Sequence, residues 1–136
     1  MKHKVLSKVA LCGMLLLPFA SAAVVQAAGT WTVTEEKLAP YGEWSSWGSS
    51  NTKKTNSEYA SFNGDNIPRL KWKIKVRLIN NKAQKRSEYT SLEKNRTTHA
   101  GDNTGVKNRK YWADSRTYKL DSHGPTIKFH FSADYK

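Results

Sequence analysis

The sequence has very few cysteine and aliphatic residues. Its one cysteine, Cys12, lies in an apolar N-terminal segment that we expect to be removed, so the rest of the chain has none. This excludes a disulfide scaffold, a thiol enzyme and a cysteine-ligated zinc site. In the 109 residues after position 27, valine, isoleucine and leucine together number only 12. So small an aliphatic content beside a high net charge makes intrinsic disorder an alternative to a folded domain.

Aromatic residues supply what the aliphatic residues do not. The same 109 residues carry five tryptophans, six tyrosines and three phenylalanines. Each aromatic side chain buries a large apolar area, so a set of this size can stabilise a small domain. A chain of this length is typical of one domain. We therefore expect a single folded domain over residues 28–136.

The N-terminus has the organisation of a secretory signal peptide. Three lysines precede an apolar run from Val9 to Phe19, and residues 25–27 (Val-Gln-Ala) form a small-x-small cleavage site. Residues 20–22 (Ala-Ser-Ala) are a second acceptable site. The apolar run is too short to span a bilayer and Pro18 interrupts it, which disfavours a membrane anchor. We therefore expect segment 1–27 to be cleaved and the protein to be secreted.

Apolar residues after the leader recur with a period of two, which predicts β-strands. Between Arg69 and Ile79 apolar and cationic residues alternate, and residues Ile127–Tyr135 alternate in the same way. This pattern is typical of strands with one buried face. Shorter β-prone segments are expected at Thr30–Leu38, Tyr41–Trp47, Glu58–Phe62, Ser87–Leu92, Lys110–Trp112 and Arg116–Leu120.

These strands predict the fold class. No segment after the leader has a helical stripe, and turn-rich pieces separate the predicted strands. Several short strands at this spacing indicate an all-β domain, either a small antiparallel β-sandwich or a barrel. The polar, basic segment Lys82–Lys110 is predicted to be a long exposed hairpin or a segment that orders on a partner.

A ladder of positive charge runs along the predicted strand Arg69–Ile79. Neighbours two apart on a strand are separated by about 6.6 Å, and no acidic residue interrupts the series. The predicted anion-binding residues are Arg69, Lys71, Lys73, Lys75 and Arg77. Further cations are expected in loops, at Lys53, Lys54, Lys82, Lys85, Arg86, Arg109 and Lys110.

This distribution of charge points to anionic partners. Removal of the leader lowers the net charge from +12 to +9, because three lysines leave with it. So dense a field attracts phosphates, anionic lipid headgroups or wall polymers such as teichoic acids. The alternative is a solvated outer sheet face, because lysine also protects exposed strands from aggregation.

Three aromatic residues form a second candidate contact. Tyr41, Trp44 and Trp47 lie among glycines and serines, and a spacing of three would place the two tryptophans on opposite faces of a strand. An exposed tryptophan in such a setting suits stacking on a sugar ring or insertion at a membrane interface. The alternative is that these rings fill the core.

The sequence carries little evidence of catalysis. His99, His123 and His130 lack the spacings of metal ligands, so we expect no metal, no cofactor and no enzyme activity. His130 lies opposite the apolar face of its predicted strand and is expected to be solvated. A metal-independent ribonuclease is an alternative, with His99 or His130 acting beside one glutamate. The candidate glutamates are Glu43, Glu58 and Glu88.

Short motifs resemble those of the lactococcin 972-like bacteriocin family. They are Gly29-Thr30-Trp31 directly after the leader, Tyr41-Gly42, Ser45-Ser46-Trp47, Lys53-Lys54-Thr55, Tyr111-Trp112-Ala113-Asp114-Ser115 and Phe129-His130-Phe131. The resemblance implies a cysteine-free β-sandwich protein that kills bacteria by binding a cell-wall precursor. Residues 68–108, which include the cationic strand, have no counterpart in the family pattern, so no individual functional residue is transferred.

Leader, charge and tryptophan content lead to one functional prediction and two alternatives. We expect a secreted cationic antibacterial protein that binds an anionic cell-wall polymer, a wall precursor or a membrane surface. Whether a separate immunity protein is a partner is left open, and nucleic acid is the less expected ligand. The first alternative is a non-lethal module that binds the cell wall or a polysaccharide. The second is the secreted ribonuclease.

Overall fold

The computed structural model describes residues 29–70 and 73–136. The predicted signal peptide, and Lys71 of the predicted cationic ladder, lie outside the described residues. The described part contains a short 3-10 helix, η1 (Pro40–Gly42), and eight strands. The strands are β1 (Thr32–Lys37), β2 (Asn51–Thr52), β3 (Ala60–Asn66), β4 (Ile74–Ile79), β5 (Thr90–Leu92), β6 (Thr97–Ala100), β7 (Lys110–Arg116) and β8 (Thr126–Ser132).

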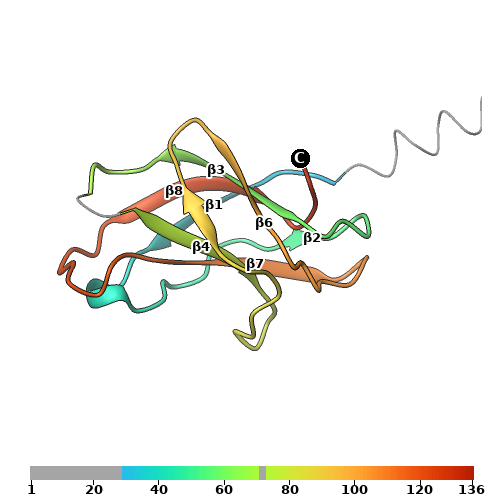
Figure 1. The fold of residues 1–136 in the computed structure, drawn as a ribbon, viewed down its shortest axis with the longest axis horizontal. Coiled ribbons are helices and arrows are strands. Elements are labelled where there is room, and N and C mark those ends of the chain that lie inside the picture. The colour runs from blue at the N-terminus through green and yellow to red at the C-terminus, as the bar shows by residue number, and fades with distance from the viewer. Residues whose placement is uncertain (1–28, 71–72) are drawn as a thin grey trace, which may run out of the picture.

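The strands form two antiparallel sheets that pack against each other (Figure 1). The first sheet has the order β1-β8-β3-β6 and the second has the order β2-β7-β4-β5. Every pairing between named strands is antiparallel. The prediction of an all-β antiparallel sandwich is therefore confirmed. Within the described residues, no helix has the length and hydropathy needed to cross a membrane.

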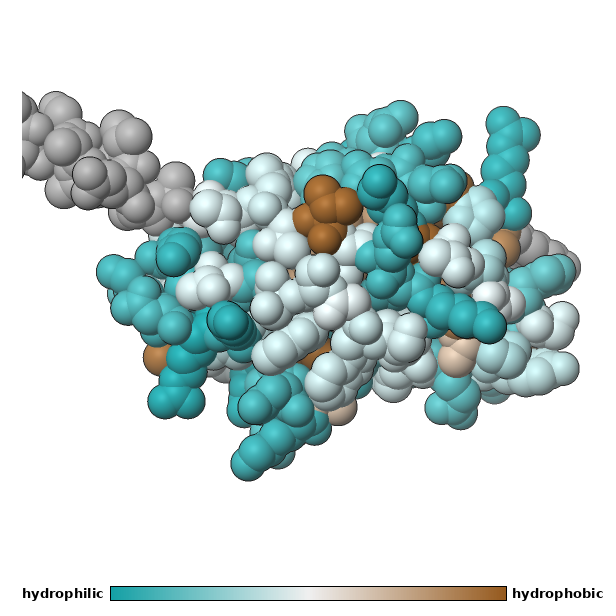
Figure 2. Space-filling model, turned by 180° about the vertical axis from the view of Figure 1, so that it is seen from behind, coloured by the Kyte–Doolittle hydropathy of each residue, from teal (hydrophilic) through white to brown (hydrophobic). Residues whose placement is uncertain are grey.

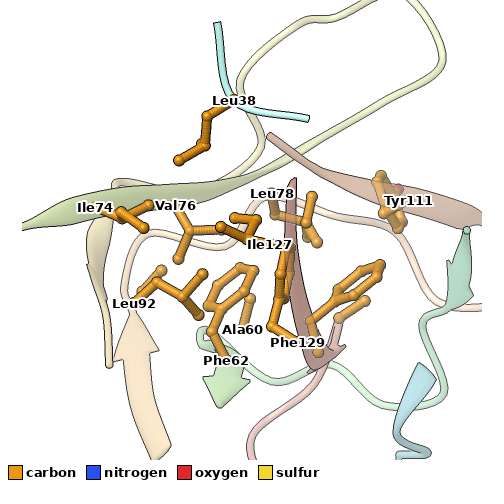
Figure 3. Close-up of a cluster of buried hydrophobic side chains, with 14 residues drawn as sticks. Leu38, Ala60, Phe62, Ile74, Val76, Leu78, Leu92, Tyr111, Ile127 and Phe129 are labelled. Atoms are coloured by element: carbon orange, nitrogen blue, oxygen red, sulfur yellow. The ribbon is translucent and has the colours of Figure 1, made fainter. Parts of the chain in front are cut away.

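Phenylalanines and aliphatic residues fill the space between the sheets. Phe62 and Phe129 of the first sheet meet Val76 and Leu78 of the second, and all four are fully buried (Figure 3). Phe62 also stacks on Phe131, with ring centroids 6.1 Å apart. None of the described tryptophans is buried: Trp44 and Trp112 are partly buried, and Trp31 and Trp47 are exposed. The aromatic part of the core thus comes from the phenylalanines and Tyr111, while the tryptophans are left for the surface.

Strand β4 shows why alternation predicts a sandwich strand. Ile74, Val76 and Leu78 are buried between the sheets, whereas Lys73 and Lys75 are exposed on the outer face. The strand begins at Ile74, so the predicted start at Arg69 is wrong. Residues 69 and 70 precede the strand and have no regular secondary structure.

The segment predicted as a strand at Tyr41–Trp47 is not one. It begins in η1, where Tyr41 and Gly42 have left-handed φ values of 61° and 75°. Two consecutive residues in that region reverse the chain and end any extended run. The segment then follows the edge of β7, where the Ser45 amide donates a hydrogen bond of 2.7 Å to the carbonyl of Ser115.

Three other predicted segments differ from the structure. Lys110–Trp112 and the start of Arg116–Leu120 belong to the single strand β7, which ends at Arg116. The segment Lys82–Lys110 is neither a long hairpin nor a loose excursion, because it supplies β5 to the second sheet and β6 to the first. Buried Asn103 fastens its far end by donating a 2.7 Å hydrogen bond to the carbonyl of Ala133.

Candidate anion-binding site

The outer face of the second sheet brings together cations from two strands. In the antiparallel register of β4 and β7, Lys75 lies opposite Arg116 and Arg77 lies opposite Asp114. Directly opposed residues project to the same side of a sheet. The outer face therefore carries Lys75 and Arg77 from β4 beside Arg116 from β7, and Lys73 lies directly before β4. We call these four residues the cationic face.

One end of the cationic face is hollowed into a pocket of about 360 Å³. Lys75 and Arg116 line it from strands β4 and β7, Lys73 lines it from the position before β4, and Lys119 lines it from the turn after β7. Gly42, Thr117 and Tyr118 complete the wall. Four cations thus converge on one cavity, which we call the cationic pocket.

Most of the positive charge in this pocket is not neutralised within the protein. Lys73 lies 3.5 Å from a carboxylate oxygen of Glu93, which also binds Arg96. By contrast, none of the carboxylates in the described part of the chain forms an ion pair with Lys75, Arg116 or Lys119. Like charges held side by side without counter-ions create a field that attracts anions.

Aromatic rings hold two of these cations in place. The Lys75 ammonium lies 4.5 Å from the centre of the Tyr89 ring. The Arg116 guanidinium lies 4.6 Å from the Trp44 ring and 5.5 Å from the Tyr89 ring. Such cation–π contacts fix the position of a cation without neutralising its charge. Lys75 and Arg116 therefore keep their charge for a ligand.

Arg77, the fifth predicted anion-binding residue, is used inside the protein. Its side chain is only 18% exposed, and its guanidinium lies 3.8 Å from the centre of the Trp44 ring and 3.5 Å from the Asp114 carboxylate. Burial raises the pKa of Asp114 to about 6 although the charge of Arg77 opposes this. No acid interrupts the ladder within its own strand, but Asp114 of the neighbouring strand β7 pairs with Arg77.

Trp44 is part of the site but does not offer a free ring. It is partly buried, and Arg77 and Arg116 lie over it. The next residue fixes the segment, because the Ser115 amide donates a 2.9 Å hydrogen bond to the Ser45 hydroxyl. The predicted opposite-face arrangement of Trp44 and Trp47 is therefore wrong, since the segment is not a regular strand.

The other predicted aromatic contacts are exposed. Trp47 is 40% exposed and its ring lies 6.2 Å from that of Trp112. Tyr41 is 62% exposed at the left-handed turn, next to Gly42 of the cationic pocket. The Tyr41 amide donates a 2.6 Å hydrogen bond to the carbonyl of Asp121, which fixes this turn against the chain that follows β7.

A buried carboxyl group lies behind the segment that carries Trp44. One oxygen of Glu36 accepts hydrogen bonds from the hydroxyls of Ser45 (2.8 Å) and Ser115 (3.1 Å). The other oxygen has no hydrogen-bond partner. Burial raises the pKa of Glu36 to about 8. Glu36 is therefore largely protonated at neutral pH, which spares the interior an unbalanced negative charge.

None of the three histidines lines the cationic pocket, and each has its own partners. His130 is not simply solvated, because its Nδ1 lies 2.8 Å from Asp65 and its ring meets the edge of Trp31. His99 stacks on Tyr135, and its Nε2 lies 3.0 Å from the carbonyl of Lys136. His123 contacts Asp121.

The two histidines of the ribonuclease alternative do not contact its candidate glutamates. In the described residues, neither His99 nor His130 forms a hydrogen bond or ion pair with Glu43, Glu58 or Glu88. The same residues contain no group of three or more His, Cys, Asp or Glu side chains able to hold a metal ion.

The structure divides the predicted anion-binding residues into three groups. Lys73 and Lys75 line the cationic pocket, Arg77 is paired internally, and Arg69 is exposed before β4 begins. The pocket also contains Arg116 and Lys119, which the prediction missed. Arg116 lies beside Lys75 through the pairing of β7 with β4, for which the sequence of β7 carries no local signal.

Comparison of the chain with protein-family models, with curated proteins and with solved structures found no match. The resemblance to the lactococcin 972-like family therefore stays a prediction based on short motifs. The chemistry of the cationic pocket is the basis for the function proposed below.

Proposed function

We propose that this chain is a secreted antibacterial protein that binds a phosphate-bearing polymer of the bacterial envelope through the cationic pocket. The observation that carries the proposal is the convergence of four cations on one cavity, three of them without a carboxylate partner in the described structure. Phosphate groups are the common anions of such polymers, and they bind both lysine and arginine.

The geometry supports recognition of a phosphate with part of its backbone. A cavity of about 360 Å³ falls in the range of small-molecule sites, so it is large enough for more than a bare ion. Arg116 offers the planar donor fork that matches two phosphate oxygens. Because Trp44 and Tyr89 already hold Arg116 in place, little side-chain entropy is lost on binding.

The antibacterial part of the proposal has separate support. It comes from the predicted leader, the net charge of +9 after its removal, and the resemblance to a bacteriocin family. The same pocket would serve a non-lethal wall-binding module. The two functions differ in their effect on cells, so each needs its own measurement.

Wall binding tests the pocket. Secreted protein is mixed at low salt with purified Gram-positive cell walls, with and without teichoic acid. We expect Lys75→Gln/Arg116→Gln to weaken binding about tenfold or more, because two phosphate contacts are lost. The matched control is Lys37→Gln/Lys128→Gln, which removes the same charge from exposed positions of the first sheet. Equal losses in both variants would mean that net charge, and not the pocket, drives binding.

Growth inhibition tests the antibacterial part. We expect micromolar protein to inhibit related Gram-positive bacteria, and the Lys75→Gln/Arg116→Gln variant to lose most of that effect. Wall binding without any growth inhibition would instead favour the non-lethal wall-binding module.

A further inference from the structure

A second cationic hollow lies at the other end of the same sheet face. It has a volume of about 470 Å³, and its wall includes Arg86, Arg109, Lys110 and Trp112. We call it the distal hollow. Asn80 and Asn81, which follow β4, and Thr104, Val106 and Tyr111 complete the wall.

The cations of the distal hollow also lack acidic partners. Arg109 and Lys110 are exposed, and within the described residues no carboxylate pairs with either. Arg86 reaches only the side-chain oxygen of Gln84 and the carbonyl of Lys85, both at 3.3 Å. The distal hollow therefore has the same electrostatic character as the cationic pocket, although the loop before β7 builds part of it.

Strand β7 joins the two hollows in a line. Lys110 lines the distal hollow and Arg116 lines the cationic pocket. Alternate residues of a strand point to one side, so both lie on the outer face, six positions apart. At about 3.3 Å per residue, their separation along the strand is about 20 Å. A single phosphate headgroup cannot occupy both sites.

The surface between the hollows favours a polyol or sugar backbone over a polynucleotide. Stacking of nucleic-acid bases needs open aromatic faces. Trp44 is covered by Arg77 and Arg116, and the rings of Trp47 and Trp112 contact each other at a tilt of 41° with centroids 6.2 Å apart. The exposed part of Trp47 and the polar side chains between the two hollows can contact a hydroxylated chain. They offer few free ring faces for the stacking of bases.

We propose that the ligand is a linear phosphodiester polymer with a polyol or sugar backbone, which lies along β7 with phosphates in both hollows. This inference rests on the proposed function and names its substrate class as a multivalent polymer, not a single-phosphate wall precursor. Two weak sites joined by one chain bind far more tightly than either alone, because the second contact is intramolecular.

Calorimetric titration at low salt with ligands of two lengths tests the inference. The short probe is glycerol phosphate and the long probe is poly(glycerol phosphate) that exceeds the distance between the hollows. We expect the long probe to bind at least about 100-fold more tightly per chain. In Arg109→Gln/Lys110→Gln, the long probe should lose about tenfold or more in affinity, whereas the short probe should keep its affinity for the cationic pocket and lose only its weak binding to the distal hollow.

The pocket variant and the control separate this inference from the proposed function. Lys75→Gln/Arg116→Gln should weaken both probes, and Lys37→Gln/Lys128→Gln should weaken neither strongly. If only the pocket variant affects the long probe, the proposed function stands and the two-site inference is overturned. If neither variant differs from the control, both fall.

Two further ligands test the chemistry of the backbone. A single-stranded polynucleotide of equal charge should bind at least about tenfold more weakly than poly(glycerol phosphate), because few ring faces are open for stacking. Equal binding would overturn the backbone assignment in favour of nucleic acid. Vesicles of anionic phospholipid should lose no affinity in Arg109→Gln/Lys110→Gln beyond that of the control. A tenfold loss there, without one on the long probe, would overturn the polymer in favour of a membrane surface.

Discussion

Two groups of cations in this protein have opposite environments. Lys53 is buried, and its ammonium donates hydrogen bonds to the carbonyls of Ser57 (2.7 Å) and Ala133 (2.9 Å) and lies 3.5 Å from Asp134. Lys75 and Arg116 are held by aromatic rings and have no carboxylate partner in the described structure. The sequence predicted both Lys53 and Lys75 as exposed cations and missed Arg116, but in the structure Lys53 is buried and structural whereas Lys75 and Arg116 are available to a ligand. Pairing, not the count of charges, separates the two roles.

The buried pair is well satisfied on its acidic side as well. Asp134 accepts hydrogen bonds from the amides of Lys54 (2.8 Å) and Thr55 (2.9 Å) and from the Thr55 hydroxyl (2.6 Å). Burial lowers the pKa of Lys53, and the charge of Asp134 opposes that shift. A buried pair of this kind is expensive to break, because loss of one partner leaves the other charge unbalanced.

The largest expected effect is therefore that of Asp134→Ala. We expect it to lower the free energy of unfolding by about 3–5 kcal/mol, since Lys53 and the two amides lose their acceptor. Urea unfolding at pH 7 measures this. Glu43→Ala, at an exposed position, is the control and should change stability by less than about 0.5 kcal/mol. A loss below about 1 kcal/mol for Asp134→Ala would contradict the structural role of the pair.

The buried carboxyl group of Glu36 makes the stability of the protein depend on pH, in contrast to the exposed cations of the pocket. The folded-state pKa of Glu36 is raised to about 8 from 4.5, so the folded protein holds a proton that the unfolded chain releases. Stability should therefore fall as pH rises from about 4.5 to 8, by about 3–5 kcal/mol in total. Asp114, with its pKa raised to about 6, adds a loss in the lower part of that range.

Glu36→Gln isolates this effect. The amide is neutral at every pH, so the variant should be more stable than the unchanged protein at pH 8 and should lose little stability between pH 6.5 and 8.5. That window lies above the pKa of Asp114, whose contribution remains in the variant at lower pH. Urea unfolding across the window measures both proteins. Equal slopes in the two would show that Glu36 is ionised in the folded state.

Trp44 contacts both an internally paired cation and a cation of the pocket. Its ring packs against Arg77, which is paired internally, and against Arg116, which lines the cationic pocket. Cation–π contacts of this kind contribute roughly 0.5–2 kcal/mol each. We expect Trp44→Ala to lower stability by about 1–3 kcal/mol and to weaken phosphate binding several-fold, with partial rescue in Trp44→Phe. If stability falls but affinity for glycerol phosphate does not, then Arg116 needs no positioning.

The sequence predicted the framework of the fold better than the site. Alternation identified the core residues of β4 and β8, because burial of one strand face leaves a local pattern. The pairing of Arg77 with Asp114 joins residues 37 positions apart and depends on strand register. Lys119 enters the pocket only because β7 ends at Arg116 and the chain turns. Contacts between strands leave no such local pattern. The sequence therefore predicted the cations of one strand but not the residues of β7 and its turn that lie beside them.

Lys75→Gln/Arg116→Gln should have the smallest effect on stability, and it tests the comparison most directly. Lys75 has no carboxylate partner, and Arg116 only adds to the charge with which Arg77 opposes the raised pKa of Asp114, so their removal relieves repulsion and sacrifices mainly cation–π contacts. We expect the free energy of unfolding to change by less than about 1 kcal/mol, while affinity for the long probe falls at least about tenfold. A protein retains unpaired like charges at some cost to stability when a ligand uses them. If this variant unfolds as readily as Asp134→Ala, the two groups of cations are both structural and the distinction between them fails.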